Sequence, residues 1–395
     1  MIASIGNSLK RCATALALLL VVQPAAAQKQ GDDSVLRALV GGTRAFALGH
    51  DREAAGYFDV AVDAISAIWG ASPQSADARS LWYEEAVKPF KGDPYERMMA
   101  FYYRGLVFLK QHDFGNAQAA FRMSVQQDAF AEEEQNNYDA VLPLFLQGWA
   151  LQQQGSSVGA REAFRMVREL RPDFPVDDPT ITAANTVVVV ETGNGPRKVA
   201  DGVGSYKLRF FRGKNFQEAR ATVRLPDGRQ VPLYPIEDVY WQATSRGGRQ
   251  VDYIFEGKAR FAERNENIGS ALSVAASDLA IRKYQHDGKA GDGMSKAADA
   301  LSVLSIGALA LSARAKPAVD TRYWDNLPDA VHIAVLDLPP GQHTLGLSFT
   351  SATGAALPEL DRTVQLTIPP APGKPALVWA SSRDRTSRYV LKARN

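Results

Sequence analysis

The chain has 395 residues, of which 46% are hydrophobic and 22% are charged, a composition typical of a globular protein rather than of a disordered, collagen-like or disulfide-stapled one. Its 45 Lys and Arg residues nearly balance its 43 Asp and Glu residues, so the composition lacks the strong basic excess typical of nucleic-acid-binding domains. At this length we expect more than one structural unit.

The first 27 residues have the order of a secretory signal peptide. Lys10 and Arg11 precede an apolar stretch at 13–22, and small residues ending at Ala27 follow it. The apolar stretch is too short to span a bilayer. Cys12, the single cysteine, precedes this stretch, so it does not occupy the place of a lipid-modified cysteine. We therefore predict an exported protein of the periplasm or cell envelope, cleaved after Ala27, thiol-free, without a lipobox and neutral in charge.

Residues 28–182 are predicted to form a helical domain built from repeated hairpins. Three segments share one template, in which a small residue is followed twelve positions later by Ala and sixteen positions later by Phe. This template is typical of tetratricopeptide-like hairpins, because the small residue lets two helices cross closely while the aromatic ring fills the gap between them. Generic antiparallel helix packing is the alternative. The three copies are Gly42, Ala54 and Phe58; Gly105, Ala117 and Phe121; and Gly148, Ala160 and Phe164.

A helix is predicted to begin between the first two copies. Asp93 is placed to cap it, Pro94 to occupy its first position and Glu96 to lie in its first turn. The following residues, 97–106, are aromatic on more than one face. We therefore expect this helix to be buried on one side and to contact something else on another.

The segments 183–260 and 317–395 are predicted to form a β-rich domain. Short β-branched or alternating runs are separated there by turn residues, a spacing that suggests an antiparallel sandwich or barrel-like sheet. The predicted strands are 186–192, 206–212, 221–225, 239–243, 331–338, 344–349, 363–368, 376–379 and 389–391.

Residues 261–316 interrupt the β-rich domain with a small-residue-rich helical insertion. Within it, Ala300 to Ala313 carries no charge and would be roughly 21 Å long as a helix, shorter than the hydrocarbon core of a bilayer. This length favours a buried helix, with a membrane-surface or oligomer contact as the alternative. The predicted fold class is therefore α+β and multidomain, with tetratricopeptide-like helical hairpins followed by an antiparallel β-sandwich-like domain that carries a helical insertion.

The residue types of a catalytic or metal site do not occur in the required patterns. The five histidines include no HExxH motif and no pair at helical i, i+4 spacing. His332 and His343 flank a Pro-Pro-Gly turn, and we expect a cross-strand pair rather than a ligand pair. Glu237 and Asp238 are adjacent in a predicted strand and should point to opposite faces, which argues against a hydrolase that uses both. We predict no catalytic residue, no cofactor and no metal.

Arg246 and Arg249 form the remaining chemical candidate. They lie on a glycine turn, where two guanidinium groups could bind a carboxylate or phosphate bidentately and so form an anion site. The alternative is a hairpin whose arginines are solvated or pair with Glu237, Asp238 or Asp252.

A partner-binding surface is predicted on the inner face of the first helix in the second and third hairpins. Aromatic side chains with a few polar groups suit an extended peptide or a partner helix. The alternative is that the β-rich half or the insertion covers part of this face. The predicted partner-binding residues are Met99, Tyr102, Leu106, Lys110, Phe145, Trp149, Gln152 and Gln153.

The chain resembles a family of uncharacterised bacterial envelope proteins with a tetratricopeptide-like N-terminal half. The segments that carry the resemblance are KPFKGDPYER (88–97), YYRG (102–105), ETGNGPRK (191–198), RGGR (246–249) and DTRYWDNLP (320–328). Some members of the family are lipoproteins and are thought to act beside other envelope lipoproteins, whereas this chain lacks the lipid-modified cysteine. The family has no established activity, so the resemblance implies no catalytic residue.

These observations predict a non-enzymatic scaffold of the periplasm or cell envelope that binds a protein or peptide partner through its helical surface. Contact with the outer membrane would be peripheral, nucleic acid is not an expected partner, and the oligomeric state is open. One alternative is a glycan- or envelope-surface-binding module in the β-rich domain, and a hydrolase is the less favoured one. The candidate glycan platforms are Trp241, Trp324 and Trp379.

Overall fold

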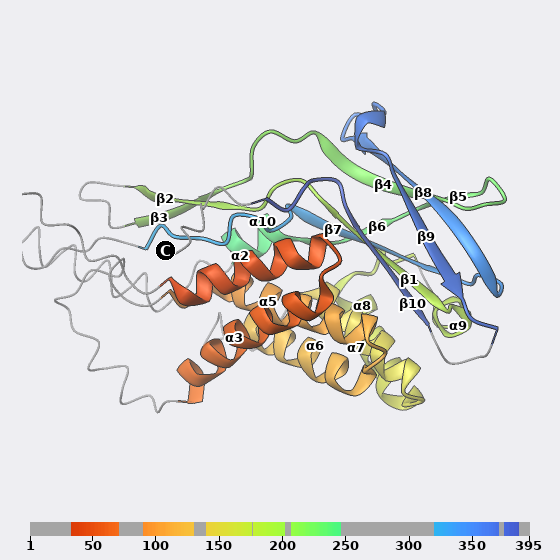
Figure 1. The fold of residues 1–395 in the computed structure, drawn as a ribbon, viewed down its shortest axis with the longest axis horizontal. Helices are drawn as coiled ribbons and strands as arrows, with labels where there is room; N and C mark the ends of the chain where they lie inside the picture. Colours follow the sequence, from red (N-terminus) through yellow and green to blue (C-terminus); the bar gives the residue numbers. More distant parts are fainter. Residues whose placement is uncertain are drawn as a thin grey trace, which may run out of the picture.

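The computed structural model describes residues 33–70, 90–129, 140–175, 177–201, 207–245, 320–370 and 375–386. It has N-terminal helical hairpins followed by a β-rich region with mostly antiparallel sheets, so the predicted α+β class is confirmed (Figure 1). No helix in these ranges has the length and apolar character needed to cross a membrane. The predicted signal peptide, the insertion at 261–316, Arg246, Arg249 and the strand at 389–391 lie outside the described residues.

In the described part of the chain, three helical hairpins form one side of the fold, and two short helices lie further along the sequence (Figure 1). The hairpins pair α2 with α3, α5 with α6 and α7 with α8. The helices are α2 (Ser34–Ala47), α3 (Asp51–Gly70), α5 (Pro94–Lys110), α6 (Phe114–Ala129), α7 (Val141–Gln153), α8 (Ser157–Leu170), α9 (Asp178–Ala183) and α10 (Val239–Ser245).

The small residue and the phenylalanine of each repeat meet where the two helices of a hairpin cross. A Cβ atom built on Gly105 would lie 2.4 Å from the ring of Phe121, which is fully buried. The same overlap arises between Gly42 and Phe58 and between Gly148 and Phe164, at 2.7 Å in both. The sixteen-residue spacing therefore marks a close helix crossing, as the repeat template predicts.

Among the described residues, the β-rich region consists of two four-stranded sheets and a two-stranded ribbon. The first sheet has the order β10-β1-β7-β6 and the second β5-β4-β8-β9, while β2 pairs with β3. Of the described strand pairs, only β1 and β10 are parallel, and the others are antiparallel. The bounds are β1 (Thr186–Thr192), β2 (Arg197–Asp201), β3 (Lys207–Phe211), β4 (Glu218–Arg224), β5 (Gln230–Pro232), β6 (Tyr234–Asp238), β7 (Ala330–Leu336), β8 (Gly341–Ser351), the 3₁₀ turn η2 (Pro358–Leu360), β9 (Arg362–Ile368) and β10 (Ala376–Ser381).

Strand β1 lies in the middle layer, between the helices and the second sheet. All seven of its residues are buried. Val187 and Val189 belong to the apolar core shared with the helices, whereas Val188 and Val190 belong to the core between the two sheets. Because successive side chains of a strand point to opposite faces, one run of valines serves both cores.

The predicted strand at 239–243 is wrong, because this segment forms helix α10. The carboxylate of Asp238 accepts a hydrogen bond from the backbone N–H of Trp241 at 2.9 Å, a local contact that satisfies a free donor of the first helical turn. This contact outweighs the strand preference of the Val-Tyr-Trp sequence, which is a weak constraint by itself.

The predicted pairing of His332 with His343 is also wrong. The two residues belong to β7 and β8, which lie in different sheets, because the Pro-Pro-Gly connection crosses the sandwich instead of turning a hairpin. His332 is 1% exposed and its Nε2 lies 3.5 Å from the hydroxyl of Thr192, whereas His343 Nε2 lies 2.7 Å from the carbonyl of Pro339.

The close crossing at Gly105 predicts opposite effects for two glycine-to-alanine changes in helices. We expect Gly56→Ala, on an exposed face of α3 with no atom within 4 Å of the added Cβ, to stabilise the protein through helix propensity. Gly105→Ala has the same propensity gain but must displace the ring of Phe121. Urea unfolding should therefore separate the two variants by about 1–3 kcal/mol, with Gly105→Ala the less stable. Equal stabilities would contradict the close crossing.

Candidate functional site

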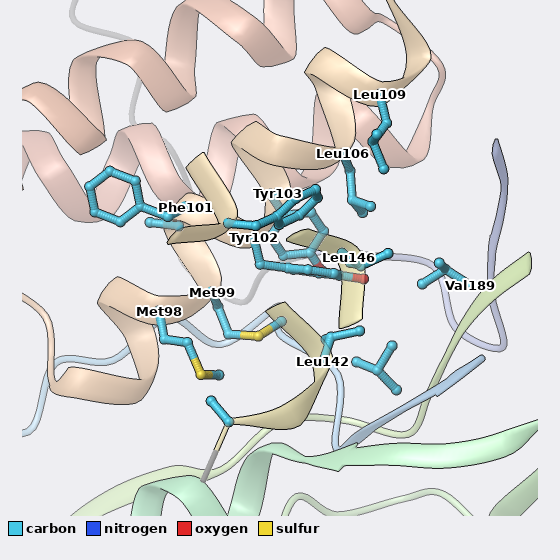
Figure 2. Packing of buried hydrophobic residues seen from close by; sticks show 14 of the residues in the cluster. Met98, Met99, Phe101, Tyr102, Tyr103, Leu106, Leu109, Leu142, Leu146 and Val189 are labelled. Carbon is cyan, nitrogen blue, oxygen red and sulfur yellow. The ribbon is translucent and has the colours of Figure 1, made fainter. Parts of the chain in front are cut away.

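Five of the eight predicted partner-binding residues lie inside the protein. Met99, Tyr102, Leu106, Phe145 and Trp149 are each at most 1% exposed. Figure 2 shows the first three packed among side chains from α7 and β1. The expectation that these five residues face a partner is corrected here, because the β-rich half of the same chain occupies the inner face of the hairpins.

Glu191 on β1 anchors the sheet to helix α5. Its carboxylate accepts hydrogen bonds from the hydroxyls of Tyr102 at 3.2 Å and Tyr103 at 2.8 Å, and from the indole N–H of Trp379 at 3.1 Å. The guanidinium of Arg385 completes the cluster, with its Nε 3.2 Å from a carboxylate oxygen. Burial raises the pKa of Glu191, and burial next to this carboxylate raises the pKa of both tyrosines well above their usual value.

A second buried cluster surrounds the start of helix α5. Asp93 is its N-cap residue and Pro94 its first residue, as predicted. The carboxylate of Glu96 accepts the backbone N–H groups of Asp93 and Trp324, both at 2.7 Å. Lys198 on β2 lies 2.5 Å from Asp93 Oδ2 and 2.7 Å from Glu96 Oε2. Glu96 therefore joins the helix to two distant segments of the β-rich region.

Burial and the neighbouring charges shift the pKa values of Glu96 and Lys198 in opposite directions. Burial raises the pKa of Glu96, against the lowering effect of the Lys198 ammonium. Burial also disfavours the Lys198 ammonium, but the carboxylates of Asp93 and Glu96 outweigh it and raise the pKa of Lys198. The cluster is thus a charged group of three side chains whose carboxylates depend on one shared cation.

Residues from three of the segments quoted in the sequence analysis meet in this cluster. Glu96 comes from 88–97, Lys198 from 191–198 and Trp324 from 320–328. The segment 191–198 also supplies Glu191, which binds Tyr102 and Tyr103. Their shared position indicates a structural role, since the polar groups are held between layers of the core by fixed hydrogen bonds.

The carboxylates of Glu237 and Asp238 diverge, as expected for neighbours in a strand. Glu237 is buried and accepts from the backbone N–H of Leu142 at 3.2 Å, whereas Asp238 binds Arg212 at 2.6 Å. Arg212 also lies 2.5 Å from Asp329, whose pKa burial raises to about 7 despite this contact. The two neighbouring carboxylates therefore do not form a pair that could act on one substrate.

The tryptophans proposed as platforms have different environments. Trp324 is fully buried, and the partly buried Trp379 donates to Glu191. Trp241, on helix α10, is 54% exposed. Across the described ranges, no group of three or more His, Cys, Asp or Glu side chains is arranged to hold a metal ion.

An open pocket lies at the edge of the helical layer, where α7 ends, α8 begins and α9 packs beside them. It has a volume of about 440 Å³ and contains one of the predicted partner-binding residues, Gln152. Gln153 is partly exposed, and Lys110 lies elsewhere, paired with Asp51 at 2.5 Å. The residues that line the pocket are Gln152, Ser157, Arg161, Pro179, Thr182 and Ala183.

Arg161 gives this pocket its charge. Its side chain is exposed, and it has no carboxylate partner among the described residues. Sequence reasoning missed the pocket because it did not resolve α9 as a helix. A usable signal was present: Asp177 and Pro179 mark a helix start, and Asp177 accepts the backbone N–H of Thr180 at 2.9 Å.

Comparison of the chain with protein-family models, with curated proteins and with solved structures found no match in any of the three.

The Lys198 cluster predicts a large loss of stability when its cation is removed. We expect Lys198→Met to lower the free energy of unfolding by about 3–5 kcal/mol at pH 8, because the buried carboxylate of Glu96 and the partly buried carboxylate of Asp93 lose their shared counter-ion. The deficit should shrink as the pH falls and Glu96, whose pKa is raised, takes up a proton.

Urea unfolding at pH 8 and pH 5 measures this effect. Lys110→Met is the matched control, because its bridge to Asp51 is partly exposed and should contribute about 1 kcal/mol or less. If Lys198→Met and Lys110→Met lost similar amounts of unfolding free energy, burial of the Lys198 cluster would make no additional contribution to stability.

His332 predicts a loss of stability in mild acid. Burial lowers its pKa from 6.5 to about 4, so the folded protein holds the ring neutral while the unfolded chain protonates it. The contribution of His332 to stability is therefore complete above pH 6.5 and is lost progressively as the pH falls towards 4. Between pH 7.5 and pH 5, the wild type should lose about 2 kcal/mol more than His332→Gln in urea unfolding. Parallel pH profiles for the two proteins would contradict this assignment.

Proposed function

We propose that the protein is a non-enzymatic scaffold of the periplasm or cell envelope that binds a protein or peptide partner at the pocket between α7, α8 and α9. One observation carries this proposal: the inner face of the hairpins is filled by the chain's own sheet, whereas the pocket at the edge of the same helical layer is open. The proposed partner surface is therefore at the edge of the helical layer and not on the inner face predicted from the sequence.

The lining of the pocket suits a short peptide segment with an acidic group. The guanidinium of Arg161 can bind a carboxylate through two hydrogen bonds, and the amide of Gln152 can bind a peptide backbone group. Pro179 and Ala183 add apolar contact area. Either an Asp or Glu side chain or a C-terminal carboxylate fits this chemistry.

The buried charges support a binding role rather than a catalytic one. Glu96 and Glu191 are fully buried, and each carboxylate is held by a cation and by several hydrogen-bond donors. A general acid or base must reach the proton that it transfers, and these groups lie within the packed core. The order of charged, apolar and small residues at 1–27 supports export.

A glycan-binding β-rich half has weaker support. Two of its three candidate platforms, Trp324 and Trp379, contribute to the core and to the Glu191 cluster. Stacking on a sugar needs an exposed ring face, which leaves Trp241 on helix α10.

Site-specific photo-crosslinking tests the pocket. A photoreactive amino acid at Thr182, in the pocket, should give a discrete adduct in intact cell envelopes, and Arg161→Glu should reduce that adduct about tenfold, because it replaces the attraction to a carboxylate by repulsion. The same probe at Asn116, exposed on α6, is the matched control and should give no such adduct.

Adducts of equal yield from both positions would contradict the proposal, as would an adduct at Thr182 that Arg161→Glu leaves unchanged. Circular dichroism of Arg161→Glu should match the wild type, because Arg161 is exposed and has no described ion pair to lose.

A further inference from the structure

The ribbon of β2 and β3 presents a mixed basic and apolar face. The two strands pair with each other and, within the described chain, with no other strand (Figure 1). Residues directly opposite each other in an antiparallel pair share a face, so Arg197 lies beside Phe211 and Val199 beside Arg209. Val199 and Phe211 are each 40% exposed, and Arg209 is exposed as well. We call this set of four residues the outer face of the ribbon.

The opposite face fixes the ribbon on the body of the protein. Lys198 reaches Asp93 and Glu96 at the start of α5, and the ring of Phe210 packs edge-on against Tyr95 with the ring centroids 6.0 Å apart. The strand alternation then directs the outer face away from α5. Its exposure is therefore a fixed property of the fold.

The segment around the ribbon contains more basic than acidic residues, although two of its cations, Lys198 and Arg212, are paired with carboxylates from other segments. Residues 197–220 contain seven Lys or Arg and two Asp or Glu, while the whole chain carries 45 and 43. The guanidinium of Arg197 contacts the Phe211 ring, 5.8 Å from its centroid, and the carbonyl of Arg212. Among the described residues no carboxylate pairs with it, so its charge remains available on the surface.

Helix α10 adds a large aromatic side chain next to the ribbon. This helix contacts β3, and Arg212 ties the two together by binding Asp238 at 2.6 Å and lying 4.7 Å from the centre of the Tyr240 ring. Trp241, which follows, is 54% exposed. Exposed Trp, Phe and Val beside Arg are typical of surfaces that enter the headgroup region of a membrane.

We propose that the outer face of the ribbon, together with Trp241, docks on an anionic phospholipid surface. Arg197 would pair with a lipid phosphate, while Phe211, Val199 and Trp241 enter the boundary between headgroups and acyl chains. A soluble polyanion would be bound by the cations alone and would give no role to the exposed apolar side chains. Each basic side chain contributes about 1 kcal/mol at such a surface, so the docking should be reversible and sensitive to salt.

This surface is separate from the pocket of the proposed function. The ribbon and the pocket lie at opposite ends of the described fold, with β2 and β3 at one end and α8 and α9 at the other (Figure 1). A protein that is docked on lipid through the ribbon would therefore keep the Arg161 pocket open to a partner.

Vesicle flotation tests the proposal with the processed chain that begins at Gln28, because the apolar stretch at 13–22 would itself bind lipid. The protein should float with vesicles of phosphatidylglycerol and phosphatidylethanolamine, should not float with phosphatidylcholine vesicles, and should be released by salt. Arg197→Gln should weaken binding to the anionic vesicles about fivefold, which corresponds to the loss of one basic contact. Phe211→Ser should weaken it by a similar factor.

Two variants provide matched controls. Arg122→Gln and Val158→Ser change an exposed cation and an exposed apolar residue of the helical layer, and both should bind anionic vesicles as the wild type does. Circular dichroism identifies any variant that fails to fold. Arg197→Gln and Phe211→Ser test the charged and the apolar contribution to vesicle binding independently.

Three results would overturn the proposal. The first is absence of binding to anionic vesicles. The second is equal loss in the ribbon variants and their controls. The third is loss of binding in Arg197→Gln but not in Phe211→Ser, together with equal retention of Phe211→Ser on a polyphosphate column, which would indicate a site for soluble polyanions.

Discussion

The two-sided burial of strand β1 holds the two halves of the molecule together. Its odd-numbered valines pack against the helical hairpins and its even-numbered valines against the second sheet. Glu191 extends the row that faces the helices and ends in a set of donors from α5 and β10. A slip of one residue in the pairing of β1 would turn this carboxylate towards the apolar core of the sandwich. The polar cluster therefore favours the observed register over that alternative.

The use of the inner helical face for internal packing determines where a partner can bind. Tyr102 is buried beside strand β1, where it donates a hydrogen bond to Glu191, and Trp149 is buried in the same core, so both side chains are packed without a ligand. Within the described residues, the margins of the layers offer exposed surfaces that this packing does not use. The Arg161 pocket and the outer face of the ribbon are two such margins, and they differ in shape: one is a hollow with polar and apolar lining and the other an exposed basic and apolar face.

Local features of the fold could be predicted from the sequence, while the contacts between distant segments could not. The Gly105–Phe121 crossing lies within one hairpin, so its spacing is set by helix geometry. The contacts of Glu96 with Lys198 and with Trp324 span 102 and 228 residues, and no local pattern encodes them. The residues of the inner helical face have the same composition whether a peptide or the chain's own sheet covers them, which is why their exposure was predicted wrongly. Helix α10 was missed because one capping contact outweighs the propensity of its sequence.

The parallel pairing of β1 with β10 has a consequence for how the chain acquires its structure. These strands are 186–192 and 376–381, so the first sheet pairs β1 with a strand that is synthesised much later than β1 itself. Until they arrive, Glu191 lacks the indole of Trp379 and the guanidinium of Arg385. The helical hairpins can form early from local contacts, but their aromatic inner face stays uncovered during that interval and would be prone to association. Completion of the core therefore waits for β10 and the residues that follow it, and loss of β10 would destabilise the first helices as well as the sheet.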